Sequence, residues 1–444
     1  MLITRQYYNK FNLYLSTVLF FSYSSYASGK IDEYRDLINP HTKVVLTCDG
    51  GGIRGIIPLT IAAAIEKEAG VRIAEGCDLM EGTSTGGILT LGLNYPDEND
   101  PSKPKYQASD LLNIYHQYSK DIFPPLSFRK VYTLNGFLGA RYSGNGIQKV
   151  AKQYFADGLM SSSITKVGIV ANNIDPDVPY VFYSDDPYTD WYMHDVVKAT
   201  AAAPTYLPVA AIHPLKKTSE GFEVDKLRYF VDGGISSMNN PSTRAYADIS
   251  DMIYQEVDEE LKMETDIQRQ VINSYLCKNV RFISLGTGYV ETHQSYDSMR
   301  NAGVLNWLSP LINLTLGMPS QSNDQQMRTF LPSYRDEKDN MITRYWRLNP
   351  DITKSMEAMD NVSLQNRQAL EHVAQLYIEQ NKDVISEIAQ VLKARAHYKK
   401  KEQEFMAQDT TDKEKRKFSK HKFKKVLNEL DRNTNDLPVV QKSA

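Results

Sequence analysis

From residue 43 onward, short apolar runs alternate with stretches that carry helix start and stop signals. Residues 43–48 form a short apolar run that ends at glycines, which predicts a buried strand. Residues 58–69 predict a helix, with proline in its first turn and Gly70 as a stop signal. Further strands are predicted at residues 77–80, 167–171, 180–183, 229–231 and 280–285, and a second helix at 87–93. Strands that alternate with helices predict an α/β fold, with a mostly parallel central sheet and helices on both faces.

The last part of the chain has a different pattern, because strand signals stop after about residue 355. We therefore expect an α/β domain over residues 43–355 and a helical, basic C-terminal extension over 356–444. Residues 393–425 hold 13 Lys and Arg against five Asp and Glu, a net charge of +8. One apolar helix face is predicted by the spacing of Phe423, Val426, Leu427 and Leu430. Such a segment can lie on an anionic membrane, bind nucleic acid or form a solvated helix.

The first 27 residues have the layout of a signal peptide. Arg5 and Lys10 precede an apolar stretch at residues 11–21, and Ser25 and Ala27 are the small residues expected before a cleavage site. The apolar stretch is shorter than the roughly 20 residues that a membrane-spanning helix needs. We therefore expect an exported protein, secreted or periplasmic. An uncleaved anchor or an ordinary leading helix, in a cytoplasmic or membrane-associated protein, is the alternative.

Composition excludes several classes of protein. The 444 residues carry 51 Lys and Arg against 54 Asp and Glu, so the chain as a whole is not a polyanion binder and no nucleic-acid partner is expected. Hydrophobic residues at 41% exclude a disordered chain, and a mean hydropathy of −0.45 excludes a multi-span membrane protein. Cys48, Cys77 and Cys277 are too few and too scattered for a disulfide framework or a Cys-rich zinc site.

A glycine-rich loop follows the first predicted strand. Asp49-Gly50-Gly51-Gly52-Ile53-Arg54-Gly55 opens the first predicted helix, and Gly50, Gly52 and Gly55 match the spacing of a dinucleotide fingerprint. Glycines let backbone N–H groups converge on an anion at a helix N-terminus. That anion is either a cofactor pyrophosphate or the oxyanion of an acyl-transfer intermediate. A tight turn without any ligand is the third interpretation.

A second motif favours acyl transfer. Gly82-Thr83-Ser84-Thr85-Gly86 lies between the predicted strand at 77–80 and the predicted helix at 87–93. Gly-x-Ser-x-Gly at a strand-to-helix turn is typical of a nucleophile elbow, in which flanking glycines allow the sharp turn that exposes the serine hydroxyl. We therefore predict that Ser84 is a nucleophile.

A nucleophilic serine needs a base, and Asp232 is the best-placed residue. It ends the predicted strand at 229–231 and is followed by Gly233-Gly234. A carboxylate at the C-terminal end of a parallel strand would lie on the same sheet edge as Ser84 and the glycine loop. By itself, Asp-Gly-Gly is more often an ordinary turn. The histidines that follow residue 190 lack a comparable position as a base; they are His194, His213, His293, His372, His397 and His421.

Together, and in this order, the three motifs resemble those of the patatin-like phospholipase family. Asp49–Gly55 is similar to its Asp-Gly-Gly-Gly-x-Arg-Gly loop, Gly82–Gly86 to its elbow, and Asp232-Gly233-Gly234 to its Asp-Gly-Gly/Ala element. Residues 199–206, 142–144 and 239–241 also resemble family segments, so that the likeness covers about residues 43–350.

The resemblance implies a three-layer α/β sandwich and a Ser–Asp dyad that works without histidine. It implies that Ser84 is the nucleophile and Asp232 the general base. It also implies that the backbone N–H groups of Gly50, Gly51 and Gly52 form the oxyanion hole, with the Arg54 side chain nearby. The implied function is a lipid acyl hydrolase of phospholipase A or lysophospholipase type, acting on phospholipid or lysophospholipid at a membrane surface. No element calls for a metal or cofactor. The alternative is a non-catalytic module that binds a nucleotide or lipid through the Gly50–Gly55 loop.

Overall fold

The computed structural model describes most of the chain between residues 38 and 407. The described ranges are 38–39, 41–125, 128–261, 272–273, 276, 279–291, 295–336 and 338–407. The chain divides into two units, residues 1–39 and 40–444, and the following description concerns the second. The predicted signal peptide, Cys277, His293 and the apolar helix face that begins at Phe423 lie outside the described residues, and the predictions made for them stay predictions.

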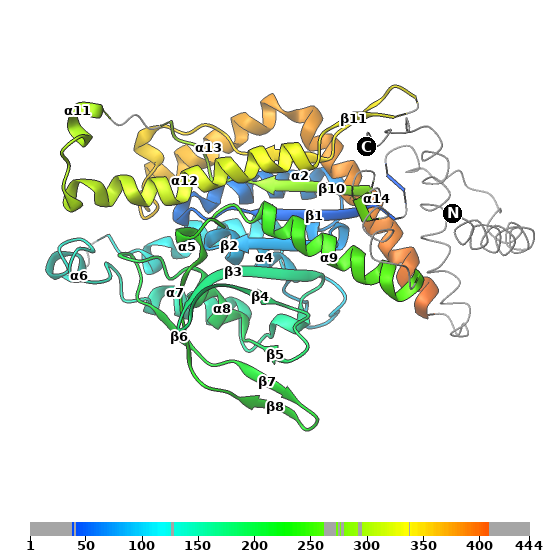
Figure 1. The fold of residues 1–444 in the computed structure, drawn as a ribbon, viewed down its shortest axis with the longest axis horizontal. Helices are drawn as coiled ribbons and strands as arrows, with labels where there is room; N and C mark the ends of the chain where they lie inside the picture. Colours follow the sequence, from blue (N-terminus) through cyan, green and yellow to red (C-terminus); the bar gives the residue numbers. More distant parts are fainter. Residues whose placement is uncertain are drawn as a thin grey trace, which may run out of the picture. The chain divides into compact units, whose positions relative to one another are not determined.

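An eight-stranded sheet forms the centre of the second unit (Figure 1). Its order is β13-β10-β1-β2-β3-β9-β6, with β4 also paired to β3. The strands are β1 (Lys43–Cys48), β2 (Leu79–Thr83), β3 (Lys166–Ile174), β4 (Asp177–Tyr183), β6 (Ala210–Ile212), β9 (Arg228–Asp232), β10 (Val280–Leu285) and β13 (Tyr345–Leu348). The strands from β13 to β3 are parallel, whereas β4 and β9 run antiparallel to β3. The predicted α/β fold with a mostly parallel sheet is confirmed.

Strands β2 and β9 meet end to end along one edge of β3. Residues 166–170 of β3 pair with β2, and residues 171–173 pair with β9. Strand β4 pairs with residues 168–174, so it occupies the other edge of β3. Thr83 is opposite Val170, and Asp232 is opposite the next residue, Ala171. The C-terminal ends of β2 and β9 therefore face each other across one step of the ladder.

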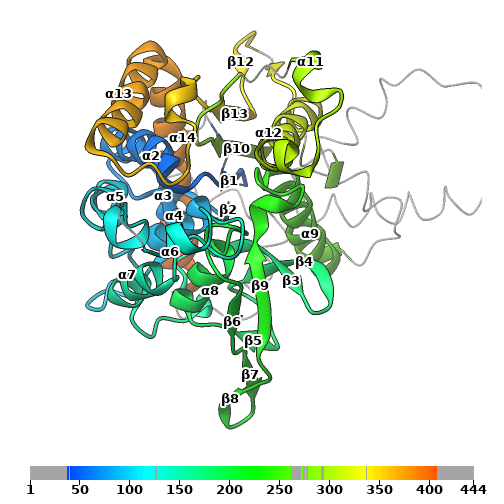
Figure 2. The same ribbon diagram turned by 90° about the vertical axis from the view of Figure 1, so that its left-hand side faces the viewer.

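Helices cover both faces of the sheet, as Figure 2 shows. One layer contains α2 (Ile56–Ala69), α3 (Ile73–Gly76), α4 (Thr85–Asn94), α5 (Ala108–Ile122), α7 (Asn145–Phe155), α8 (Met193–Thr200), α13 (Leu364–Gln380) and α14 (Lys382–Ala407). The other contains α9 (Ser242–Leu261) and α12 (Val304–Phe330). The short helices α6 (Phe128–Tyr132) and α11 (Tyr296–Met299) lie outside these layers.

Short elements complete the fold. They are the 3-10 turns η1 (Gly52–Gly55), η2 (Met160–Ser162), η3 (Gly233–Ile235) and η4 (Lys354–Met356), the three-stranded sheet of β5 (Thr189–Asp190), β7 (Leu215–Thr218) and β8 (Gly221–Val224), and the pair β11 (Tyr334–Arg335) and β12 (Met341–Ile342). Among the described helices, none is both long and apolar enough to cross a bilayer.

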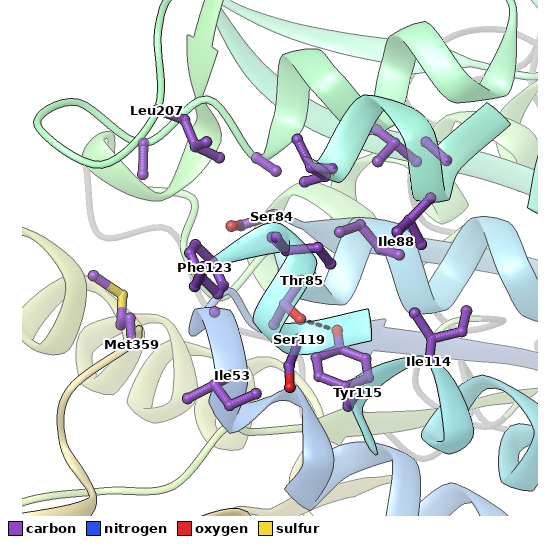
Figure 3. Close-up of a pocket in the computed structure, with 18 of the residues that line it drawn as sticks. Ile53, Ser84, Thr85, Ile88, Ile114, Tyr115, Ser119, Phe123, Leu207 and Met359 are labelled. Atoms are coloured by element: carbon purple, nitrogen blue, oxygen red, sulfur yellow. Dashed lines mark hydrogen bonds between the residues drawn. The ribbon is translucent and has the colours of Figure 1, made fainter. Parts of the chain in front are cut away.

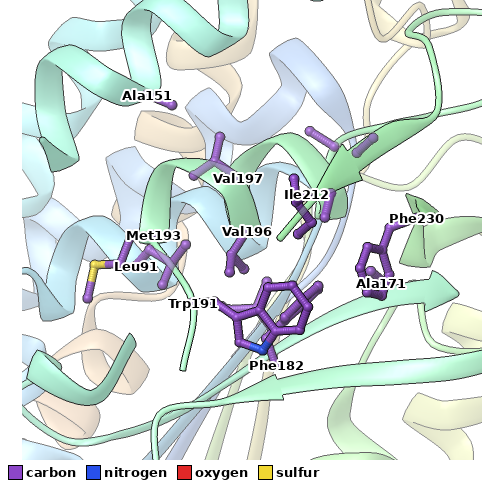
Figure 4. Packing of buried hydrophobic residues seen from close by; sticks show 14 of the residues in the cluster. Leu91, Ala151, Ala171, Phe182, Trp191, Met193, Val196, Val197, Ile212 and Phe230 are labelled. Atoms are coloured by element: carbon purple, nitrogen blue, oxygen red, sulfur yellow. The ribbon is translucent and has the colours of Figure 1, made fainter. Parts of the chain in front are cut away.

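An aromatic cluster packs α8 against β3, β4 and β9 (Figure 4). The ring of Phe182 lies 5.0 Å from that of Trp191 and 4.9 Å from that of Phe230, measured between centroids. All three side chains are buried, and the Phe182–Trp191 contact is edge-to-face, an arrangement that stabilises a core beyond the area that it buries. Because Phe230 lies two residues before Asp232, this cluster holds the end of β9 against β3.

The helix α14 packs against α2 and α3, so the first part of the basic segment contacts the α/β body. The buried Arg395 donates two hydrogen bonds to Asp78, of 2.7 and 2.9 Å, and Lys399 donates to the carbonyl of Cys77. These two cations are therefore not on a solvated helix face. The segment beyond residue 407 lies outside the described residues, and the domain boundary near residue 355 stays a prediction.

Candidate active site

Ser84 occupies a strained turn between β2 and α4. Its φ of 54° and ψ of −122° lie in a region that non-glycine residues rarely adopt. Its N–H donates to the Thr200 hydroxyl at 2.8 Å, and that hydroxyl donates to the carbonyl of Val170 at 2.6 Å. A Cβ on Gly82 or Gly86 would lie 2.3 or 2.2 Å from a backbone oxygen, so neither position accepts a side chain. The backbone therefore forms the sharp turn that the motif predicts.

Asp232 is buried at the end of β9, with 4% of its surface exposed. Its Oδ1 accepts a hydrogen bond from the Gly234 N–H at 2.7 Å, and its carbonyl accepts one from the Asn172 amide at 2.7 Å. Burial raises the pKa of Asp232 to about 6, although the neighbouring Ser84 side chain and the Gly234 N–H each lower it. A carboxylate with this pKa is ionised at neutral pH but accepts a proton more readily than an ordinary aspartate.

The strand that carries Asp232 is antiparallel to β3, which corrects the parallel direction that we expected. If β9 were parallel to β2 and β3, Asp232 would reach the carboxyl edge of the sheet from the same direction as Ser84 does. Instead, β9 approaches from the opposite direction and stops where β2 stops. Ser84 and Asp232 therefore meet at the junction of two strands, and both line the same cavity.

The glycine loop is held by hydrogen bonds to its own carbonyls. The Thr287 hydroxyl donates to the Gly50 carbonyl at 2.7 Å, and the Arg54 N–H and Nε donate to the Gly51 carbonyl at 3.2 and 3.4 Å. The Gly50 N–H donates to the carbonyl of Asn239 at 3.1 Å. This N–H is already used, so the predicted oxyanion contact from the Gly50 amide is wrong for this conformation.

The amides of Gly51 and Gly52 remain available. Within the described residues, neither N–H has a hydrogen-bond acceptor. In a trans peptide the C=O and the following N–H point in opposite directions, so anchoring a carbonyl also directs the next N–H. Thr287 directs the Gly51 N–H in this way, and Arg54 directs the Gly52 N–H. The Arg54 side chain thus acts on the loop itself, and burial lowers its pKa against the opposing effect of nearby Glu357.

The loop has no space for side chains. A Cβ on Gly50 would lie 3.2 Å from the Ser84 Cβ, and one on Gly52 would lie 2.4 Å from the Met359 carbonyl. Gly52 also has a φ of +59°, which favours glycine. At Gly55 and Gly233 a Cβ would lie within 2.4 to 2.7 Å of a neighbouring atom. Every glycine of the three motifs therefore lies where backbone packs against other atoms or, at Gly234, where its N–H holds Asp232.

A buried ion pair fixes the start of the loop. The Arg347 guanidinium on β13 donates to both carboxylate oxygens of Asp49, at 2.8 and 2.5 Å, and to the hydroxyl of Ser284 at 2.9 Å. Both charged side chains are less than 10% exposed. A two-pronged contact of this type fixes geometry as well as charge. Asp49 therefore enters the glycine loop in one orientation.

An apolar cavity opens beside Ser84, with an empty volume of about 880 Å³ that includes its mouth. In Figure 3, the Ser84 hydroxyl lies between Leu207 and Met359 on one side and Ile88 and Ile114 on the other. The Tyr115 hydroxyl, which would otherwise add a polar group, is hydrogen-bonded to Thr85. The walls come mainly from α4, α5, α7 and α8, and include Phe123, Ile147, Val150, Phe155, Val197 and Leu207. Such a cavity suits a hydrocarbon chain.

None of the described residues that line this cavity is a histidine. His194 is buried beside Asp195, with its Nδ1 at 3.2 Å from that carboxylate, and its ring is stacked on Tyr192. His213 is exposed and contacts the Asp225 carbonyl. His372 and His397 lie on α13 and α14, and His421 lies outside the described residues. No group of three metal-binding side chains that could hold an ion was found among the described residues.

Sequence reasoning missed four supporting residues: Thr200, Asn239, Thr287 and Arg347. For Thr200 and Asn239 a signal is present, because residues 199–206 and 239–241 resemble segments of the family. For Thr287 the signal is Gly286-Thr287-Gly288, a third glycine turn directly after a predicted strand. Arg347 has no local signal, since it lies 298 positions from its partner.

Comparisons with known proteins identify the family that this part of the chain matches. The family described as Patatin-like phospholipase matches residues 46–245, which include Ser84, Asp232 and the glycine loop. Residues 46–245 form a patatin-like phospholipase domain. Patatin-like protein 2 of Oryza sativa subsp. indica is 27% identical over 76% of this chain and 84% of its own length. Patatin group D-2 of Solanum tuberosum is 27% identical over 74% and 82%.

One relative of the patatin-like domain shows that likeness alone does not establish activity. A Solanum tuberosum protein that is 29% identical over 72% of this chain and 82% of its own length is named "Probable inactive patatin-3-Kuras 1". Among solved structures, VipD from Legionella pneumophila matches 89% of this chain and 85% of its own at 12% identity, with a TM-score of 0.24. The family and its relatives support a lipid acyl hydrolase at the level of the family. The roles of single residues rest on the geometry of this chain.

Proposed function

We propose that this protein hydrolyses fatty-acyl esters of phospholipids or lysophospholipids, with Ser84 as nucleophile and Asp232 as general base. The observation that carries the proposal is the junction of β2 and β9. It brings a serine on a strained elbow and a buried carboxylate of raised pKa to the wall of one apolar cavity.

In the first step, Ser84 Oγ attacks the acyl carbonyl carbon and its proton passes to the Asp232 carboxylate. The Gly51 and Gly52 N–H groups donate to the oxyanion that develops, and a single donor of this kind is worth about 10²–10³ in rate. The C–O bond of the ester then breaks. The departing alcohol takes the proton from Asp232 and leaves an acyl-serine.

In the second step, water attacks the acyl-serine while Asp232 again accepts a proton. The same two amides stabilise the second oxyanion. Collapse of this intermediate releases the fatty acid and returns the proton to Ser84. The hydrocarbon chain stays in the apolar cavity throughout, where burial of each CH₂ contributes about 0.8 kcal/mol to binding.

Hydrolysis of a soluble short-chain ester tests the dyad directly. Ser84→Ala and Asp232→Asn should each lower kcat/KM by about 10⁴-fold or more, and the double variant should be little worse than either, because members of one catalytic unit are non-additive. His194→Ala and His213→Ala serve as controls and should retain substantial activity. A large loss in one histidine variant, with Asp232→Asn still active, would replace the dyad by a Ser–His arrangement.

The pH dependence of kcat/KM provides a second test. The base must be ionised, so activity should fall about tenfold per pH unit below pH 6 and level off above it. The histidine variants should keep this profile. A serine-reactive fluorophosphonate should label Ser84 and not the Ser84→Ala variant. Absence of both turnover and labelling would instead favour a binding module.

Fatty-acid release from phosphatidylcholine, lysophosphatidylcholine and a triacylglycerol would identify the preferred lipid.

We also propose that the chain is exported and acts peripherally at a membrane. The export proposal rests on the layout of residues 1–27. N-terminal sequencing of natively produced protein should begin near Ser28, and an intact Met1 in a cytosolic fraction would contradict it.

A further inference from the structure

A short segment beside the cavity exposes large apolar side chains. This docking segment comprises residues 128–138, which include α6. Soluble proteins rarely expose a contiguous apolar patch of this kind without a use for it. The exposed fractions are 92% for Phe128, 73% for Val131, 63% for Tyr132, 60% for Leu134, 54% for Phe137 and 67% for Leu138.

The docking segment is built to present these side chains outward. The polar Thr133 is only 3% exposed, and its hydroxyl donates to the Arg129 carbonyl at 2.6 Å, while its apolar neighbours face solvent. Leu134 has a φ of 49°, which is costly for a residue with a bulky side chain, and Asn135 has a φ of 55°, which asparagine tolerates better. The Arg129 Nε closes the loop by donating to the Ala140 carbonyl at 2.8 Å. This is the inverse of an ordinary surface turn, in which polar side chains face water.

The docking segment lies next to the mouth of the cavity. The Arg141 N–H, directly after it, donates to the Thr205 carbonyl at 2.9 Å, and the Arg141 guanidinium stacks 4.3 Å from the ring centroid of Tyr206. Tyr206 and Leu207 both line the cavity. In Figure 1 the arrow of β10 points toward the side on which α6 lies, and Figure 2 looks onto that side. Helix α6 therefore lies on the side of the carboxyl edge of the sheet.

The charge around the docking segment is positive. Residues 128–141 contain Arg129, Lys130 and Arg141 and no acidic residue. Asp360 pairs with Arg141 at 2.9 Å and lies 3.9 Å from Lys130, and the side chains of Arg141 and Lys130 are 16% and 26% exposed. The three cations and this acid together carry a net charge of +2. An exposed apolar loop with excess positive charge complements an anionic lipid surface, into which apolar side chains insert while cations meet the headgroups.

We propose that the docking segment inserts into the surface of an anionic phospholipid bilayer. The cavity mouth then faces lipid, and an acyl chain reaches Ser84 without crossing water. This inference rests on the proposed function for the identity of the ligand in the cavity. It places a membrane contact at the active-site edge of the sheet. Of the basic segment 393–425, Arg395 and Lys399 are bonded to the body, and residues 408–425 lie outside the described residues.

Co-sedimentation of the full chain with vesicles tests the proposal. The chain carries Ser84→Ala so that lipid is not consumed, and the vesicles contain phosphatidylcholine and phosphatidylglycerol at 3:1. Phe128→Ser, Leu134→Ser and Leu138→Ser combined should weaken binding at least tenfold. The matched control is Phe222→Ser with Val224→Ser, which removes two exposed apolar side chains, 51% and 70% exposed, from β8. This control should bind as the parent chain does.

Activity on a soluble short-chain ester separates this proposal from the proposed function. With Ser84 intact, the triple variant should hydrolyse such an ester within twofold of wild type but lose at least tenfold on the same vesicles. Unchanged vesicle binding by the triple variant, or an equal loss of binding in the β8 control, would overturn the proposal that the docking segment inserts into the bilayer. Loss in the triple variant of a dimer that wild type forms without lipid would instead assign the segment to a second copy of the chain. If the wild-type protein does not hydrolyse the soluble ester, the proposed hydrolase function is refuted. The vesicle-binding experiment would still test the membrane contact independently.

Discussion

Two buried Asp–Arg pairs lie at opposite edges of the same sheet. Asp49 follows β1 at the carboxyl edge and pairs with Arg347 at 2.8 and 2.5 Å. Asp78 precedes β2 at the amino edge and pairs with Arg395 at 2.9 and 2.7 Å. Each pair joins an early part of the chain to a segment about 300 residues later. Their chemistry and burial are almost the same, but their surroundings differ.

The difference lies in what each aspartate leads to. Asp49 directly precedes the glycine loop, so its orientation affects the direction of the Gly51 and Gly52 N–H groups, two and three residues later. Asp78 instead accepts the Val44 N–H at 2.8 Å, close to Lys43 and Lys399. Burial raises the pKa of Asp78, but Arg395, Lys43 and Lys399 outweigh it and hold that pKa below its ordinary value. The same interaction thus lies next to the proposed active site at one edge of the sheet and away from it at the other.

Arg347→Met should have the largest combined effect. It leaves the Asp49 carboxylate buried and unpaired, which costs about 3–5 kcal/mol of unfolding free energy. Because Asp49 also orients the glycine loop, kcat of the protein that remains folded should fall at least 100-fold, about the effect of losing one oxyanion donor. Urea unfolding and ester hydrolysis well below the melting temperature measure the two effects. Full kcat in a destabilised variant would show that Arg347 supports the fold alone.

Arg395→Met is the matched change at the amino edge. It removes the partner of Asp78 and should cost a similar 3–5 kcal/mol of unfolding free energy. The active site lies at the other edge, so kcat in the folded protein should stay within twofold of wild type. Part of the stability loss should disappear below pH 4, where the Asp78 of the unfolded chain is protonated. A kcat loss equal to that of Arg347→Met would remove the distinction between the two edges.

Asp232→Asn should stabilise the protein at high pH. The pKa of Asp232 is raised from 3.8 to about 6, so between these values the folded chain holds more protons than the unfolded chain. Wild-type stability therefore falls as the pH rises through this window, by roughly 3 kcal/mol for two pKa units. The variant cannot ionise there and should gain up to this amount at pH 8 but little at pH 4. Urea midpoints at both pH values measure the gain, and Asp251→Asn on the exposed face of α9 should show none.

Thr287→Val should have the smallest effect. It keeps the shape of the side chain but removes the hydroxyl that holds the Gly50 carbonyl, so the Gly51 N–H loses its fixed direction. We expect kcat/KM to fall about tenfold, equivalent to about 1.4 kcal/mol, with KM nearly unchanged. Thr287→Ser keeps the hydroxyl and should restore most of the activity. If both variants behave like wild type, the loop does not depend on this anchor.

The local sequence predicted the parts of the site that depend on backbone geometry. A loop that turns sharply or approaches other backbone needs glycine whatever the rest of the chain does. Gly50–Gly55, Gly82–Gly86 and Gly233-Gly234 are such loops, and each directly follows a strand predicted from its apolar run. For this reason the order of strands and helices and the positions of Ser84 and Asp232 could be proposed before the fold was known.

The sequence by itself thus determined an α/β chain with three glycine turns and two residues suited to acyl transfer. Only the tertiary structure decided the direction of β9, the use of the Gly50 N–H by Asn239, and the partners Thr287, Arg347 and Arg395. An apolar run of three residues predicts a strand but not its direction, because direction depends on which neighbour it pairs with. Hydrogen bonds and ion pairs between residues about 190 to 320 positions apart leave no periodic signal in either segment. They arise because the packed core brings those segments together.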